Sequence, residues 1–121
     1  MKTSEMLEKI LEDLKATGGI EASLVASRDG LIIHTNMDLK EHAQTFAAMS
    51  ATMLGAAETA TLELRKGIPD RIIVESDKGK IIATGSGKKA LLVILTKPNA
   101  SLGIILIEVA KSSEKIREVL G

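Results

Sequence analysis

The residues best suited to chemistry lie in the segment Gly85-Ser86-Gly87-Lys88-Lys89, whose glycines and lysines have the composition of a phosphate-binding loop. A loop of the Walker type has a glycine five residues before its Gly-Lys pair and a Ser or Thr directly after the lysine. Ile82 and Lys89 occupy those two positions here. The next residues, Ala90 to Leu95, are apolar and typical of a strand, whereas a phosphate loop leads into a helix. The sequence therefore favours a hairpin turn over a nucleotide site.

The only imidazoles belong to His34 and His42. A zinc ion or an acid–base reaction would need partner side chains at ligand spacing, and the chain has no H-x-x-x-H pair, no H-E-x-x-H motif and no cysteine. The acidic residues form no pair that periodicity sets apart as acid and base. No Gly-x-Ser-x-Gly segment indicates a nucleophilic serine. We therefore predict a non-enzymatic protein without a cofactor or a metal ion.

The charge balance and the scarcity of aromatic residues exclude further classes of protein. The 121 residues include 16 Lys and Arg and 16 Asp and Glu, so the formal net charge is zero. A nucleic-acid-binding protein would show a basic excess, and Phe46 alone cannot form a surface on which bases stack. The chain length predicts a single domain over residues 1–121.

No segment has the composition of a membrane anchor. Residues 1–14 carry charges throughout, which is unlike a signal peptide. The longest apolar run, Ala90 to Leu95, has the length of a strand and is too short to cross a bilayer. We expect no membrane insertion and, by default, a cytoplasmic location.

Hydrophobic periodicity and Gly-containing turns predict an α+β domain with a five-stranded antiparallel sheet. Asp29-Gly30 lies between two short apolar runs, which is a strong hairpin signal. The last strand is apolar on both faces and should lie in the middle of the sheet, whereas charges at both ends of Arg71–Glu75 suit an edge strand. The expected order is a helix (5–16), two strands (22–27 and 31–35), a helix (from after Asp38 to about Arg65), three strands (71–75, 80–84 and 90–96) and a helix (about 101–120).

The predicted middle helix is unusual, because the sixteen residues from His42 to Ala57 include no formally charged side chain. An ordinary surface helix carries charge opposite its apolar stripe. One stripe at three- and four-residue spacing is expected to pack on the protein's own core: Phe46, Met49, Met53, Ala57, Ala60 and Leu64. A second, small and uncharged face is expected to contact another protein surface: Ala43, Ala47, Ser50, Ala51 and Leu54.

Two other interpretations of the same elements stay open. A five-stranded antiparallel sheet with helices also describes ligand-sensing domains of the PAS and GAF type, whose pockets are lined by aromatic and apolar groups. With one aromatic residue, this chain favours a packed interior over a hollow one. The domain would alternatively serve as a structural subunit, with a paralogue covering the middle helix.

The order of elements and four segments resemble the Roadblock/LC7 family, which includes dynein light chain Roadblock and MglB-like domains. The segments are ASLVASRDGLIIHTN, FAAMSATMLGAAETATLEL, GIPDRIIVESDKGKIIATG and ALLVILTKPNASLGIILIEV, within a resemblance that spans residues 5–120. It implies a profilin-like, three-layer α/β/α architecture, with the first and last helices on one face of the sheet and the middle helix on the other.

The resemblance also implies partners. Family members are dimers in which the middle helices lie side by side and the following strands pair, and they bind small Ras-like GTPases or act as scaffolds in motor and signalling complexes. We therefore predict a homodimeric regulator or scaffold, with a small Ras-like GTPase as its expected partner. The predicted dimer interface comprises Ala43, Ala47, Ser50, Ala51, Leu54, Arg71, Ile73 and Glu75.

Overall fold

The computed structural model describes residues 1–38 and 40–121, with the backbone alone for Lys40 and Glu41. Three helices and five strands follow one another in the predicted order. Their bounds are α1 (Thr3–Lys15), β1 (Ile20–Ser27), β2 (Ile32–Thr35), α2 (Lys40–Glu63), β3 (Arg71–Ser76), β4 (Gly79–Ser86), β5 (Ala90–Thr96) and α3 (Leu102–Leu120).

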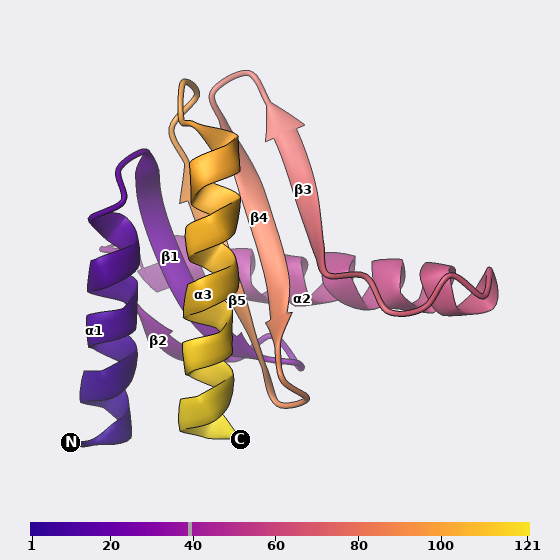
Figure 1. Cartoon of the computed structure of the whole chain (residues 1–121), viewed down its shortest axis with the longest axis horizontal. Helices are drawn as coiled ribbons and strands as arrows, with labels where there is room; N and C mark the ends of the chain where they lie inside the picture. Colours follow the sequence, from indigo (N-terminus) through magenta and orange to yellow (C-terminus); the bar gives the residue numbers. More distant parts are fainter. Residues whose placement is uncertain (39) are drawn as a thin grey trace.

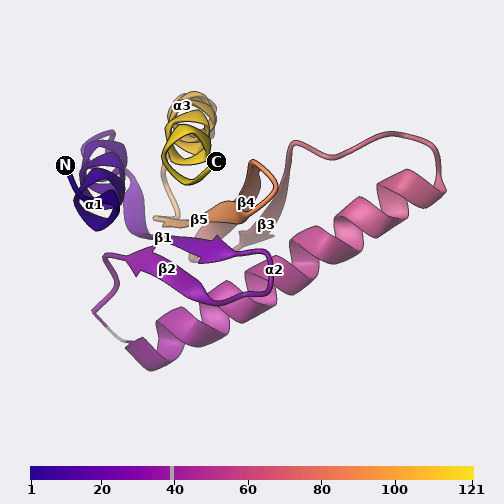
Figure 2. The ribbon, with the colours of Figure 1, turned by 90° about the horizontal axis from the view of Figure 1, so that it is seen from below.

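The five strands form one antiparallel sheet in the order β2-β1-β5-β4-β3. Helices α1 and α3 lie side by side on one face of the sheet, and α2 crosses the opposite face (Figures 1 and 2). The apolar strand β5 lies in the middle and is buried from Ala90 to Ile94, as predicted. Strand β3 is an edge strand, which confirms the expectation from its charges.

Each face of the sheet has its own core. On the face of α1 and α3, large aliphatic side chains such as Leu11, Leu92 and Ile116 are almost fully buried. On the face of α2 the buried side chains are fewer and smaller, and they include Ala47 and Leu54. Small side chains allow α2 to lie close to the strands.

The structure corrects the assignment of the two faces of α2. The small face, which the sequence assigned to a second protein surface, packs on the protein's own sheet, since Ala43, Ala47, Ser50 and Leu54 are all buried. Of the stripe assigned to the protein's own core, Phe46 is half-buried and packs at the edge of that core, whereas Met49 is 53% exposed and Ala60 and Leu64 are also exposed. Both faces lack charge, so hydrophobicity alone does not distinguish them, and the face with the smaller side chains is the one that packs on the sheet.

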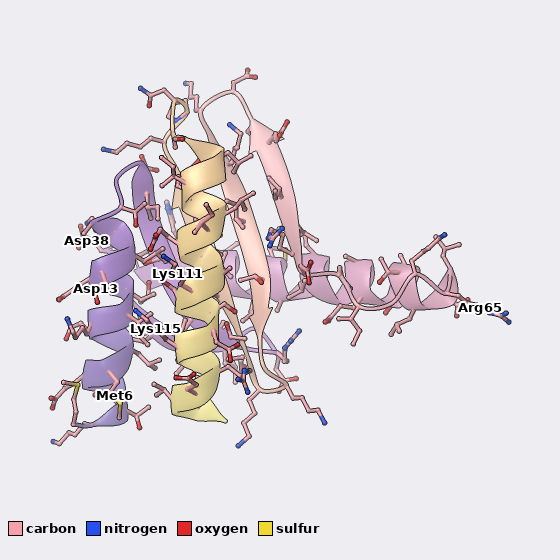
Figure 3. All side chains as sticks on the ribbon, in the orientation of Figure 1. Met6, Asp13, Asp38, Arg65, Lys111 and Lys115 are labelled. Carbon is pink, nitrogen blue, oxygen red and sulfur yellow. The ribbon has the colours of Figure 1, made fainter. Side chains whose placement is uncertain are left out.

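Helix α2 is longer than the sheet is wide. Its 24 residues span about 36 Å at 1.5 Å per residue. Five strands about 4.8 Å apart place the two edge strands only about 19 Å from each other. The helix therefore projects past β3, and Arg65 lies at the far end of this projection (Figures 2 and 3).

Candidate interaction surface on α2 and β3

Exposed apolar side chains gather along α2 and the segment that follows it. Leu64 is 71% exposed and Ile68 is 74% exposed, and Met49 and Leu62 are also exposed. Met49 and Leu64 lie on one side of the helix and Leu62 on another, so the side with Met49 and Leu64 is the candidate for a surface that another protein covers. The sequence assigned the stripe to the core, so its exposure is a finding of the structure.

One side of α2 carries no charge over five turns. Phe46, Met53 and Ala57 are half-buried there, and Met49, Ala60 and Leu64 are exposed. The alanines would let the backbone of a second helix approach closely, and methionine side chains adapt to irregular surfaces. We call the six residues Phe46, Met49, Met53, Ala57, Ala60 and Leu64 the open stripe.

Strand β3 presents a free edge beside the open stripe. It pairs with β4 from Arg71↔Thr84 to Ser76↔Gly79, and no strand of the described chain pairs with its other side. An unpaired edge has backbone N–H and C=O groups that can pair with another strand. Among the predicted interface residues of β3, Arg71 is half-buried, while Ile73 and Glu75 are exposed.

The structure does not bring all the predicted interface residues together. Arg71, Ile73 and Glu75 lie on the free edge strand, but four of the five predicted residues of α2 are buried inside the chain. Ala51, the fifth, is half-buried next to Gly30. The open stripe and β3 are the parts of this region that remain accessible to a second copy.

The residues first considered for chemistry have other positions. Gly85–Lys89 contains the tight connection between β4 and β5, where Ser86 pairs with Ala90, so the predicted hairpin is confirmed. His34 is half-buried in β2 and His42 is exposed on α2. Among the side chains of residues 1–38 and 42–121, no three of His, Cys, Asp or Glu are placed to hold a metal ion. In the same residues, no helix combines the length and apolar composition needed to cross a membrane.

Two hollows lie where α2 meets the sheet. One measures about 340 Å³ and lies at the start of α2, where its lining includes Ala22, Met37, His42 and Leu95. The other lies further along α2, at the edge of its contact with the sheet. It measures about 310 Å³ and is lined by Ala51, Leu54, Gly55, Glu58, Arg28, Lys88 and Leu91. Ligand pockets for drug-sized molecules usually enclose about 300–1,000 Å³ and bury most of the ligand. Both hollows are open to solvent and the second includes an ion pair, while the space between them is filled by side chains such as Ala47. Their geometry gives the sensor interpretation little support.

The sequence alone did not predict the ion pair between Arg28 and Glu58, which lies beside the hollow near Leu54. Arg28 Nη1 lies 3.1 Å from Glu58 Oε2, and Arg28 Nη2 donates a hydrogen bond of 2.7 Å to the Gly87 carbonyl. A signal existed in the sequence, because Glu58 is the only charged residue between His42 and Leu62. A single acid in an otherwise uncharged stretch of a helix indicates a specific partner.

Helix α3 carries a second, exposed ion pair away from α2. Arg117 donates hydrogen bonds to both carboxylate oxygens of Glu114. These bonds, together with the positive charge of Arg117, lower the pKa of Glu114. The same contacts raise the pKa of Arg117.

Comparison with known proteins identifies the family. The model of the Roadblock/LC7 domain matches residues 6–96. The chain belongs to the Roadblock/LC7 family. Its relatives include the uncharacterized protein MJ1340 of Methanocaldococcus jannaschii, 32% identical over 112 residues that cover 93% of this chain and 97% of that protein.

Solved structures share the fold of this Roadblock/LC7 domain. The gliding protein MglB from Thermus thermophilus has a TM-score of 0.88 at 19% identity, covering 98% of this chain and 91% of that chain. A structure of MglB with a tetrameric arrangement has a TM-score of 0.89 at 18% identity, covering 98% and 90% of the two chains. The predicted family and fold are thus confirmed, and both support a small regulatory domain as the role of this chain.

Proposed function

We propose that the protein is a cytoplasmic, non-enzymatic homodimer that serves as a binding platform for a small Ras-like GTPase. One observation carries this proposal: an uncharged helix stripe, with Met49, Ala60 and Leu64 exposed, and the free edge of β3 occur together in a Roadblock/LC7 domain. A helix side without charge and a strand edge without a partner both favour contact with protein.

The dimer would use both features at once. Figure 2 shows the part of α2 that projects past β3. Pairing of β3 with its copy would join the two sheets edge to edge, and this part of α2 would then lie over the partner's sheet. The open stripes would face each other across the two-fold axis. The small side chains of Ala57 and Ala60 would permit close contact between the two helices. The surface area buried by the open stripe and β3 together would approach the roughly 800 Å² per partner of a standard interface.

The GTPase is proposed because of family membership, since members of this family bind such switch proteins. No arginine of this chain is identified as an arginine finger. Arg28 and Arg117 are already bound to Glu58 and Glu114. Arg71 is half-buried in β3, and Arg65 is exposed beyond the end of α2. Because no arginine is assigned to the reaction, the proposed route for an effect on GTP hydrolysis is positioning of the GTPase's own switch residues.

The first test is the solution mass by light scattering after size exclusion, with concentration read by refractive index because the chain has no Trp or Tyr. We expect twice 12.8 kDa, maintained on dilution to low micromolar protein. A stable monomer would contradict the homodimer. A mixed species with a paralogue, found only on co-expression, would instead identify a structural subunit of a larger assembly.

The second test is calorimetry of the dimer with a Ras-like GTPase encoded in the same genome, loaded with GDP or with a non-hydrolysable GTP analogue. We expect binding that differs between the two nucleotide states, because a regulator of a switch must distinguish them. Absence of binding to every such GTPase of that genome, in both states, would contradict the proposed partner.

A further inference from the structure

Arg28 connects three parts of the chain that are distant in sequence. It follows β1, in the turn that leads to β2. Its Nη1 donates hydrogen bonds of 3.3 Å and 3.1 Å to the two carboxylate oxygens of Glu58 on α2. Its Nη2 donates to the carbonyl of Gly87 in the β4–β5 turn. One guanidinium group therefore joins both turns at this end of the sheet to the helix.

The space around this guanidinium suits arginine. A Cβ atom at Gly85 would overlap Arg28 Nη2, so the absence of a side chain at residue 85 makes room for the group. The side chain as a whole is only 31% exposed, and Arg28 Nε is buried without a hydrogen-bond partner, so the two Nη atoms alone hold the group in place. A lysine ammonium is a single point of charge and would not reach Glu58 and the Gly87 carbonyl with two separate nitrogens.

Glu58 lies where α2 leaves the sheet. Leu54 is the last buried residue of the helix, and Glu58 is one turn further along. Of the ion pairs in the described part of the chain, Arg28–Glu58 alone joins two different elements, since the others lie within α1 or α3. The first part of the projection is therefore held from the side by Arg28.

Gly55 lies between Leu54, the last buried residue of α2, and Glu58, which is bound by Arg28. A glycine inside a helix gives the backbone freedom that other residues lack. No packing demand explains it, because a Cβ at Gly55 would meet no atom within 4 Å outside the local helix. The helix thus has a glycine, with its weaker backbone restraint, directly after Leu54 and an ion pair three residues after that glycine.

We propose that Arg28 is a positioning residue that, through Glu58, fixes the direction in which α2 projects past the sheet and so sets the geometry of the surface offered to a second copy. This inference rests on the proposed homodimer for its biological meaning. Within a single chain, Arg28 sets the direction of α2 whether or not a second copy is bound. Without Arg28 the helix bends at Gly55 and the open stripe loses its alignment with β3.

The test measures that direction by pulsed electron spin resonance. The chain has no cysteine, so Lys78→Cys in the β3–β4 turn and Glu63→Cys at the end of α2 give two unique label sites, both exposed. Labelled protein is diluted into excess unlabelled protein, which confines the measured distances to one protomer. We expect a narrow distance distribution in the parent, and a broader or shifted one in Arg28→Ala and in the milder Glu58→Gln.

A matched control and a rescue variant separate positioning from general stability. Lys88→Ala removes an exposed cation at the same end of the sheet and should leave the distribution unchanged. Gly55→Ala should narrow the distribution again when it is combined with Arg28→Ala, since it stiffens the helix. Distributions in Arg28→Ala and Glu58→Gln that superimpose on the parent would overturn the proposal.

Analytical ultracentrifugation distinguishes this inference from the proposed homodimer. If the parent is a dimer, Arg28→Ala should raise the dissociation constant of the dimer about tenfold. A change of this size corresponds to a coupling free energy in the range found for residues that share one network of charged contacts. An unchanged dissociation constant would overturn the link between Arg28 and the second copy. A monomeric parent would overturn the homodimer instead, and the label distances would still decide whether Arg28 directs α2.

Discussion

Gly30 lies directly beneath Ala48 of α2: a Cβ atom at Gly30 would come within 2.9 Å of the Ala48 Cα. The turn between β1 and β2 and the helix are thus packed backbone to backbone. Gly30 also has a φ of +86°, which only glycine adopts without strain. This contact explains why α2 carries small residues toward the sheet and the turn, without reference to any partner.

Gly30→Ala should lower the free energy of unfolding by about 3 kcal/mol, the sum of backbone strain and forced separation of the turn from the helix. Chemical denaturation followed by circular dichroism measures it. Gly18→Ala is the control, because Gly18 has a φ of +91° with no atom within 4 Å of an added Cβ. It should lose only about 1 kcal/mol. Equal losses in both variants would contradict close packing at Gly30.

Ala47→Leu should destabilise the fold by about 2 kcal/mol, because Ala47 is fully buried between α2 and the sheet and extra volume there forces the two apart. Ala56→Leu adds the same volume at an exposed position of the same helix and should change stability by less than about 0.5 kcal/mol. Thermal unfolding with circular dichroism compares the two. If Ala47→Leu were as stable as the parent, the corrected orientation of α2 would be wrong.

Ala60→Glu should weaken the dimer about a hundredfold or more, since it places two like charges in the contact between open stripes. Ala60 is exposed in the single chain, so the helix content should not change. Thr59→Glu adds the same charge on the neighbouring, exposed position, which points to another side of α2, and should leave the mass of the dimer unaltered. Sedimentation equilibrium of the two variants gives the comparison, and an intact Ala60→Glu dimer would exclude this interface.

Gly85→Ala should destabilise the parent by about 1–2 kcal/mol, because the new methyl group displaces the Arg28 guanidinium. The same substitution should be nearly neutral when Arg28 is already alanine. Denaturant unfolding of the single and double variants forms a double-mutant cycle. Additive losses would show that Gly85 and Arg28 do not interact.

Arg117→Ala should raise the pKa of Glu114 toward its ordinary value, because the hydrogen bonds from Arg117 lower it. A carboxyl whose folded-state pKa is lowered stabilises the fold above its unfolded-state pKa and loses that contribution as the pH falls through the folded-state value. The pair is exposed, so its effect on stability is small and carbon-detected NMR titration is the appropriate measurement. Lys115→Ala on the same helix is the control, and an unshifted Glu114 in Arg117→Ala would refute the contact.

Local signals were sufficient for most of the fold. Asp29-Gly30 and Gly85–Lys89 mark their turns because positive φ angles and short loops depend on residues adjacent in the chain. The position of β5 in the centre and β3 at the edge also follows from the side chains of those strands alone. Alternation and turn chemistry are properties of a few consecutive residues, so the sequence states them directly.

The orientation of α2 and the Arg28–Glu58 pair were decided only in the folded chain. Both sides of α2 are uncharged, so the side that packs inward depends on how closely the helix approaches Gly30 and the strands, and small residues permit the closer approach. Arg28 and Glu58 are 30 residues apart, and their contact exists because two turns and a helix meet at one end of the sheet. The sequence by itself thus determined the elements, their order and the family, whereas tertiary packing determined which surface of the central helix is left for a partner.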